Sequence, residues 1–165
     1  MKSLRGTARV FGDNVDTDII IPARHLVLPL EEMKAFAMEP VRPGFAAEVV
    51  PGDVIVAGRN FGCGSSREQA PAVLRALGIR AIVAESFARI FFRNAINLGI
   101  PVLECSGLHG AVTEGDEIEV DPAEGAVRVH YADGSALFEA TRLPAFLLEV
   151  IRDGGLIAHL RQGGA

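Results

Sequence analysis

The fold is decided by residues 53–104, DVIVAGRNFGCGSSREQAPAVLRALGIRAIVAESFARIFFRNAINLGIPVLE. Three short apolar runs in this stretch are typical of buried strands. They are residues 53–57, 80–84 and 100–104. Two runs of good helix formers separate them, at about 65–77 and 86–98, and each is followed by a glycine that can close a helix, Gly78 or Gly99. Strands that alternate with helices in this way predict a parallel sheet with right-handed crossovers.

The pattern changes on both sides of this core. Downstream, three strictly alternating runs separated by turn-type residues predict an antiparallel meander. These runs are residues 116–120, 126–130 and 136–139. Upstream, the sequence predicts strands at 3–10 and 19–21 and a helix at 30–38. A last helix is expected at 143–152, after which Gly154 and Gly155 lead into a frayed tail.

Composition limits the class of protein. The chain has 165 residues, a mean hydropathy of +0.28 and a net charge of −5 with a pI near 5.4. We therefore expect a single α/β domain over residues 1–165 that needs no disulfide or structural metal. The charge balance supplies no basic surface for nucleic acid, and no apolar run is long enough for a membrane span. Two cysteines without a paired metal-site pattern favour a reducing, cytoplasmic compartment.

The richest chemical signal is the loop at residues 58–68, GRNFGCGSSRE, between a predicted strand and a predicted helix. Such a junction presents free backbone N–H groups and the positive end of a helix dipole, so it favours an anion. Three familiar glycine motifs do not match. A dinucleotide fingerprint needs glycine at Arg67, a P-loop needs Gly-Lys-Ser/Thr at residues 64–66, and a nucleophile elbow needs glycine at Glu68.

Three interpretations of the remaining Ser-Ser-Arg triplet stay open. In the simplest, Ser65 caps the helix, Glu68 completes a capping box and Arg67 is a solvated charge. That interpretation does not explain the three glycines in the loop. In the second, the planar guanidinium of Arg67 binds a carboxylate through two hydrogen bonds. In the third, Ser65 or Ser66 is a base or nucleophile whose anionic form the loop stabilises.

Three motifs in this order resemble the small subunit of 3-isopropylmalate dehydratase, which is equivalent to the swivelling last domain of aconitase. The motifs are NVDTDIIIP at 14–22, GRNFGCGSSREQAP at 58–71 and SFARIFFRN at 86–94. The resemblance covers essentially the whole chain. It implies a three-layer β/β/α swivelling domain, with a parallel core sheet and a C-terminal antiparallel meander, that closes over a large subunit. It also implies that only this partner carries the [4Fe–4S] cluster, with no cofactor and no metal ligand in the present chain.

The resemblance also assigns roles. Ser65 aligns with the catalytic base, Arg67 with the residue that binds a substrate carboxylate, and Ser66 with a neighbouring substrate contact. The implied reaction removes a proton beside a carboxylate and releases the hydroxyl from the neighbouring carbon. Water is then added back so that H and OH exchange positions. A serine hydroxyl is too weak a base without help, so its alkoxide must be stabilised by the surrounding positive charge.

The loop at residues 22–29, PARHLVLP, aligns with the segment that contacts the variable group of the substrate. Family members that act on tricarboxylates carry an arginine near the position of Val27. Aliphatic Val27 and Leu28 instead suit an isopropyl group, since an unpaired carboxylate facing them is costly. His25 replaces an expected tyrosine and Arg24 offers a compensating charge, so homoaconitate-type or dimethylmalate substrates remain alternatives. These side chains could also simply pack the loop onto the core.

Other candidate residues carry weaker signals. Asp13, Asp16 and Asp18 lack the spacing of a calcium loop and are expected to act in turns and caps. Cys63 and Cys105 cannot supply the three thiolates of an aconitase-type cluster. Arg89 and Arg93 are expected to face solvent. Two further hypotheses stay open. The chain is a non-catalytic module that binds an anion, or it forms a homo-oligomer by pairing its exposed hairpin strands, and such pairing is also compatible with an oligomer of heterodimers.

Overall fold

The computed structural model describes residues 1–163 and contains one mixed sheet with strand order β4-β3-β2-β1-β5-β6-β7. The strands are β1 Leu4–Val10, β2 Val54–Ala57, β3 Ala81–Ala84, β4 Val102–Glu104, β5 Glu117–Asp121, β6 Ala126–Tyr131 and β7 Gly134–Glu139. Strands β1 to β4 pair in parallel, whereas β1, β5, β6 and β7 pair antiparallel. The predicted parallel core and antiparallel meander are therefore confirmed, and β1 joins them. Residues 164–165 of the expected domain lie outside the described residues.

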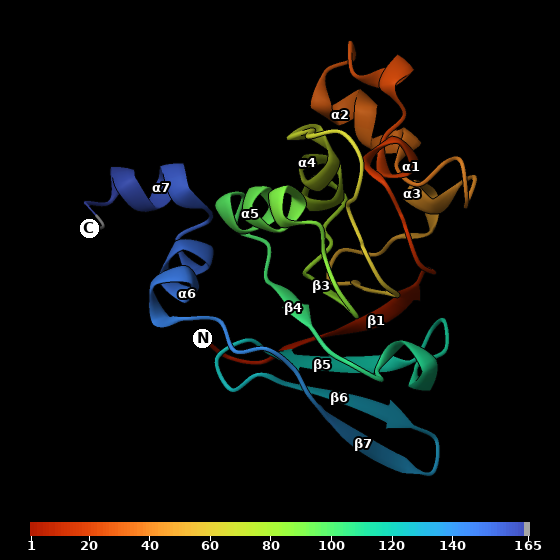
Figure 1. Cartoon of the computed structure of the whole chain (residues 1–165), viewed down its shortest axis with the longest axis vertical. Helices are drawn as coiled ribbons and strands as arrows, with labels where there is room; N and C mark the ends of the chain where they lie inside the picture. Colours follow the sequence, from red (N-terminus) through yellow and green to blue (C-terminus); the bar gives the residue numbers. More distant parts are fainter. Residues whose placement is uncertain (164–165) are drawn as a thin grey trace.

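Seven helices accompany the sheet in residues 1–163 (Figure 1). They are α1 Thr17–Ile20, α2 Leu30–Met33, α3 Phe45–Glu48, α4 Gln69–Ala76, α5 Arg89–Asn97, α6 Ala145–Arg152 and α7 Leu156–Arg161. Short 3-10 turns occupy Ala23–His25, Lys34–Phe36 and His109–Ala111. None of the described helices has the length and hydrophobicity needed to span a bilayer.

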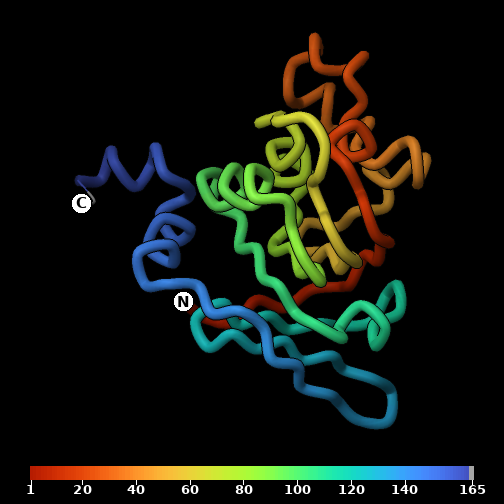
Figure 2. Tube along the Cα trace, in the orientation of Figure 1, coloured from red at the N-terminus to blue at the C-terminus, as the bar shows by residue number. Residues whose placement is uncertain are grey.

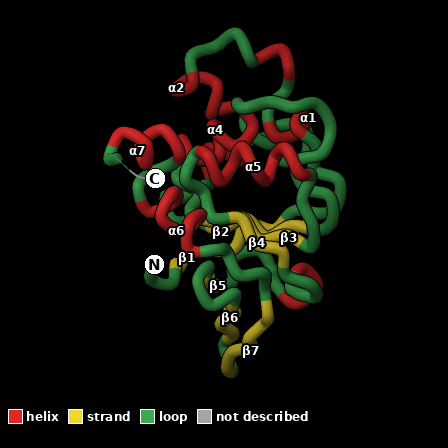
Figure 3. Tube along the Cα trace, turned by 60° about the vertical axis from the view of Figure 1, so that its left-hand side comes forward, coloured by secondary structure: helices red, strands yellow, loops and turns green. Residues whose placement is uncertain are grey.

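Helices α4 and α5 lie on one side of the parallel strands, and β5 to β7 lie on the other (Figure 3). Each of the two helices buries a single face, since Val73 and Leu74 of α4 and Phe91 and Ala95 of α5 are inaccessible or nearly so. The two central parallel strands, β2 and β3, are buried throughout, as expected for the part of a sheet that is covered on both faces. A single hydrophobic cluster extends through these layers and includes Val129 of β6. This is the layered arrangement that the family resemblance implies.

Three local predictions are wrong. Residues 19–21 were expected to form a strand, but they belong to α1 and its C-terminal end because Asp16 Oδ1 accepts a hydrogen bond from Ile19 N (2.8 Å) and starts a helical turn. The helix expected at 30–38 is split into α2 and a 3-10 turn. The tail after Gly155 was expected to be frayed, but it forms α7, in which His159 is buried and pairs with Asp153 (2.7 Å).

The irregular segment between β1 and β2 lies next to the glycine-rich loop at residues 58–68. In Figure 2 it runs from red to orange beside α4, and the loop at 58–68 passes next to it in yellow. Helix α2 contacts α4, and Ile20 and Phe45 of this segment are fully buried. The segment is therefore anchored to the core while its turns stay at the surface near the loop.

We expect Gly62→Ala to destabilise the protein by about 2 to 4 kcal/mol. Gly62 has a φ of 81°, and a Cβ there would overlap the Cβ and Cγ atoms of Phe91 on α5. Thermal or denaturant unfolding measures the loss. Gly12→Ala is the matched control, because a Cβ at Gly12 meets nothing within 4 Å, and it should unfold like the parent chain. Equal stability of the two variants would contradict the close packing of the loop on α5.

Candidate active site

The three sequence motifs meet at one place in the structure. Gly62 N of the middle motif donates to Val15 O (2.7 Å), and Thr17 N donates to Cys63 O (2.8 Å). On its other side, Phe61 forms a parallel bridge with Phe87. The middle motif is therefore hydrogen-bonded to both of the others, although the three are far apart in sequence.

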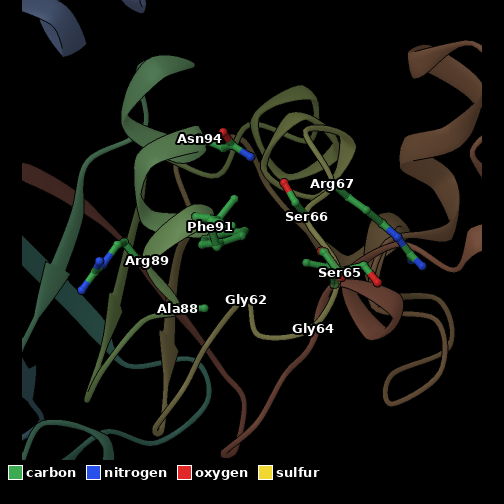
Figure 4. A pocket seen from close by; sticks show the side chains of 11 residues that line it. Gly62, Gly64, Ser65, Ser66, Arg67, Ala88, Arg89, Phe91 and Asn94 are labelled. Atoms are coloured by element: carbon green, nitrogen blue, oxygen red, sulfur yellow. The ribbon is translucent and has the colours of Figure 1, made fainter.

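A cavity of about 220 Å³ lies where they meet (Figure 4). The loop before α4 forms one wall and the beginning of α5 forms the other. The lining residues are Thr17, Gly62, Gly64, Ser65, Ser66, Arg67, Ala88, Arg89, Ile90, Phe91 and Asn94. The structure thus brings the predicted residues Ser65, Ser66 and Arg67 to one cavity.

The capping interpretation of Ser65 is wrong. Helix α4 begins only at Gln69, its N-cap is Glu68, and no side chain caps it. Thr17 Oγ1 donates to the carbonyl of Ser65 (2.8 Å) and holds this backbone against the N-terminal segment, outside the first helical turn. In the chain up to residue 163, the backbone N–H groups of residues 64–68 donate no hydrogen bond. A run of free N–H groups in a tight loop is suited to an anion.

Arg67 is held in place by the N-terminal segment. Its Nη1 donates to Asp18 Oδ1 (3.1 Å) and to the carbonyl of Ile21 (3.0 Å), and the side chain is only 16% exposed. The hydrogen bond from Arg67 is the main reason that the pKa of Asp18 lies below its usual value. Nη2 and Nε of Arg67 make no hydrogen bond to any described residue. These nitrogens are therefore available to a carboxylate.

The two serine hydroxyls are exposed and make no hydrogen bond within residues 1–163. In the view of Figure 4, Ser65 lies between the guanidinium of Arg67 and Phe91, while Ser66 points toward α5. The loop wall therefore offers one hydroxyl on the side of the arginine and a second hydroxyl that faces α5. No histidine lines this cavity, so a serine that acts as a base here depends on stabilisation of its anion rather than on a neighbouring imidazole.

The loop at residues 22–29 lies beside Arg67 but outside the cavity wall. Ala23 N donates to the same Asp18 Oδ1 that binds Arg67 (3.2 Å), which links the two. Val27 is 88% exposed, so the alternative that it packs onto the core is wrong, whereas Leu28 does pack there. Arg24 pairs with Glu39 (3.3 Å). Its charge is therefore already partly neutralised within the chain.

The remaining candidates lie in turns, in the interior or at the surface. Asp16 caps α1, and Asp13 Oδ1 accepts from Arg59 N (2.7 Å), so these aspartates act in turns and caps. Cys63 and Cys105 are both free thiols, and burial raises the pKa of Cys105 to about 11. No group of three His, Cys, Asp or Glu side chains in the described residues is placed to hold a metal ion. Arg89 is exposed and points away from the cavity (Figure 4).

Five lining residues were not among the sequence-predicted candidates. They are Thr17, Ala88, Ile90, Phe91 and Asn94. Each lies inside one of the quoted motifs, and this position was the sequence feature that could have pointed to it. Their roles could not be assigned because helical position alone does not show which face of α5 turns toward the loop.

Comparisons with known proteins agree with this geometry. Residues 48–107 match the model of the aconitase C-terminal domain. The 3-isopropylmalate dehydratase small subunit of Halothermothrix orenii is 47% identical over 97% of this chain and 96% of its own length. The chain belongs to this family of small subunits.

Two further relatives extend the family assignment. The methanogen homoaconitase small subunit of Methanothermobacter thermautotrophicus is 49% identical over 94% of this chain and 89% of its own length. The crystal structure of 3-isopropylmalate dehydratase from Methanocaldococcus jannaschii superposes with a TM-score of 0.90, at 37% identity over 98% of this chain and 95% of that one. The family therefore includes small subunits named for different acids, and its fold is the one described above.

Proposed function

We propose that this small subunit acts in a hydro-lyase that interconverts 2-isopropylmalate and 3-isopropylmalate in leucine biosynthesis. In this proposal the chain supplies Ser65 as the base and Arg67 as the carboxylate-binding residue, and it is active only with a large subunit. The observation that carries the proposal is the placement of these two side chains at one cavity in a member of this family. Arg67 is positioned by Asp18 with two guanidinium nitrogens still available.

The proposed reaction uses the residues as follows. Arg67 binds one carboxylate of the hydroxy acid and presents the neighbouring C–H bond to Ser65. The Ser65 oxygen, as alkoxide, takes this proton, the C–H electron pair forms the new double bond, and hydroxide leaves the adjacent carbon. Return of the proton from Ser65 to the carbon that lost the hydroxide, and addition of hydroxide to the carbon that lost the proton, give the isomer and restore the Ser65 alkoxide. The free N–H groups of residues 64–68 and the charge of Arg67 stabilise the alkoxide.

The large subunit completes the site in this proposal. It carries a [4Fe–4S] cluster that, when bound, supplies a Lewis acid for the departing hydroxyl. The described residues of this chain offer no ligand set for such a cluster, since no three close metal-binding side chains are found among them. The partner also closes the cavity, whose serines are exposed in the isolated chain. We place the complex in the cytoplasm, with a small hydroxy acid rather than nucleic acid as its ligand.

Anaerobic reconstitution with a large subunit tests this function. We expect turnover of 2-isopropylmalate by the complex and none by either subunit alone. Dimethylmalate and homocitrate, assayed in parallel, decide among the alternative substrates. A complex that binds isopropylmalate without converting it would instead support the anion-binding module.

Val27 is the position from which we expect the substrate preference to be changed. Val27→Arg should lower kcat/KM for isopropylmalate about 10- to 100-fold, since a charged side chain replaces an apolar contact. It should raise activity toward homocitrate, whose additional carboxylate the arginine can pair with. The side chain is 88% exposed, so the variant should unfold like the parent chain. Unchanged preference in competition assays would show that Val27 does not contact the substrate.

A further inference from the structure

The cavity has one wall whose polar chemistry the proposed function does not use. This wall is the beginning of α5, and the residues that it turns to the cavity include Ala88, Ile90 and Phe91. Arg89 belongs to the same wall, but its guanidinium points away in Figure 4. The polar side chain that extends from this wall toward the loop is that of Asn94 (Figure 4).

The carboxamide of Asn94 is not used by the described part of the chain. It is partly buried, and its carboxamide makes no hydrogen bond to any of residues 1–163. In Figure 4 it points toward Ser66, which stands on the opposite wall and also makes no hydrogen bond in the described chain. An amide that lies beside apolar side chains and has no partner in the protein needs water or a ligand oxygen as its hydrogen-bond partner. Asn94 and Ser66 therefore form a pair of neutral donors across one cavity.

The geometry points to Asn94 as a further substrate-binding residue, whose amide N–H groups donate to a carboxylate oxygen of the hydroxy acid. This inference rests on the proposed function. Arg67 and Asn94 lie on the two sides of Ser65 in Figure 4, so a dicarboxylate held at one end by Arg67 extends past Ser65 toward Asn94 and Ser66. Two anchoring points fix which C–H bond meets the serine oxygen, whereas a single arginine leaves the acid free to rotate.

Asn94 carries no charge, which allows it to donate to a carboxylate. Aspartate has nearly the same shape but accepts hydrogen bonds and carries a negative charge, so it repels a carboxylate that asparagine attracts. The chain also contains a matched control. Asn97 lies three residues further along α5, is exposed, and is absent from the lining of this cavity. Both positions are inside the helix, where alanine is favourable, so neither alanine variant threatens folding.

The test compares Asn94→Ala, Asn94→Asp and Asn97→Ala in the reconstituted complex with isopropylmalate. We expect KM to rise about 10-fold for Asn94→Ala, the effect of one lost hydrogen bond to a charged group, and about 100-fold or more for Asn94→Asp. Asn97→Ala should keep the KM of the parent chain. If Asn94→Ala and Asn94→Asp retain that KM, or if kcat alone falls, the inference is overturned.

A binding measurement separates this inference from the proposed function. Calorimetry with isopropylmalate on complexes that also carry Ser65→Ala reports affinity without turnover. A Kd raised about 10-fold by Asn94→Ala in that background supports the binding role even if the parent complex shows no isomerase activity. An unchanged Kd overturns it, whatever the activity of the parent complex.

Discussion

Replacing Ser65 with alanine is expected to reduce turnover of the reconstituted complex by at least about 1,000-fold, because it removes the only oxygen proposed to accept the substrate proton. The fold should be unaffected. The Ser65 side chain is exposed, and the hydrogen bond that holds this residue, from Thr17 Oγ1, goes to the backbone carbonyl that alanine retains.

Steady-state kinetics together with thermal unfolding of the variant provide the measurement. Ser66→Ala is the matched control, since it removes a hydroxyl from the next residue of the same loop. Its loss should be only about 10-fold, the effect of one substrate hydrogen bond. If Ser65→Ala turned over at a rate near that of the parent complex, or if Ser66→Ala were the inactive variant, the assignment of the base to Ser65 would be wrong.

Arg67→Lys is expected to lower kcat/KM by about 100- to 1,000-fold although it keeps the positive charge. In the structure one guanidinium nitrogen is occupied by Asp18 and the carbonyl of Ile21, which leaves two nitrogens for the substrate. A lysine ammonium is a single point of charge and cannot make both sets of contacts in the same geometry. The carboxylate is bound in the ground state as well as in the transition state, so most of the loss should appear as a raised KM.

Arg93→Lys is the control for this variant. Arg93 is exposed, belongs to α5 and does not line the cavity, so its replacement should leave KM unchanged. Asp18→Asn adds a second check. It keeps the shape of the acceptor but removes the charge that positions Arg67, and its effect should lie between those of the two arginine variants. Equal KM values for Arg67→Lys and the parent complex would exclude Arg67 as the carboxylate-binding residue.

The core of the fold could be predicted because its sequence signals are local. Continuous apolar runs become β2, β3 and β4, and glycines with φ near 90° end α4 and α5 at Gly78 and Gly99. The short apolar run at 19–21 could not be assigned in this way. Three apolar residues fit a strand or a helical turn equally well, and the outcome depends on the cap that Asp16 supplies.

The site could be predicted only in part, for a different reason. Ser65, Ser66 and Arg67 are adjacent in sequence, so they were found together. The contact of Arg67 with Asp18 joins residues from two distant motifs and requires the fold to be known. The start of α4 at Gln69 rather than near Ser65 likewise depends on Thr17, which holds the Ser65 backbone outside the helix.

The exposure of Val27 has a consequence for how such enzymes diverge. Its side chain is 88% exposed and lies in a short loop whose neighbours, Leu26 and Leu28, make the contacts with the core. Mutations at position 27 are therefore nearly free of selection for folding, and in the role proposed for Val27 they are selected through the substrate. After gene duplication, one copy can change its substrate preference by mutation at this position without first acquiring compensating mutations. Subunits of this family can in this way change substrate while the fold stays constant.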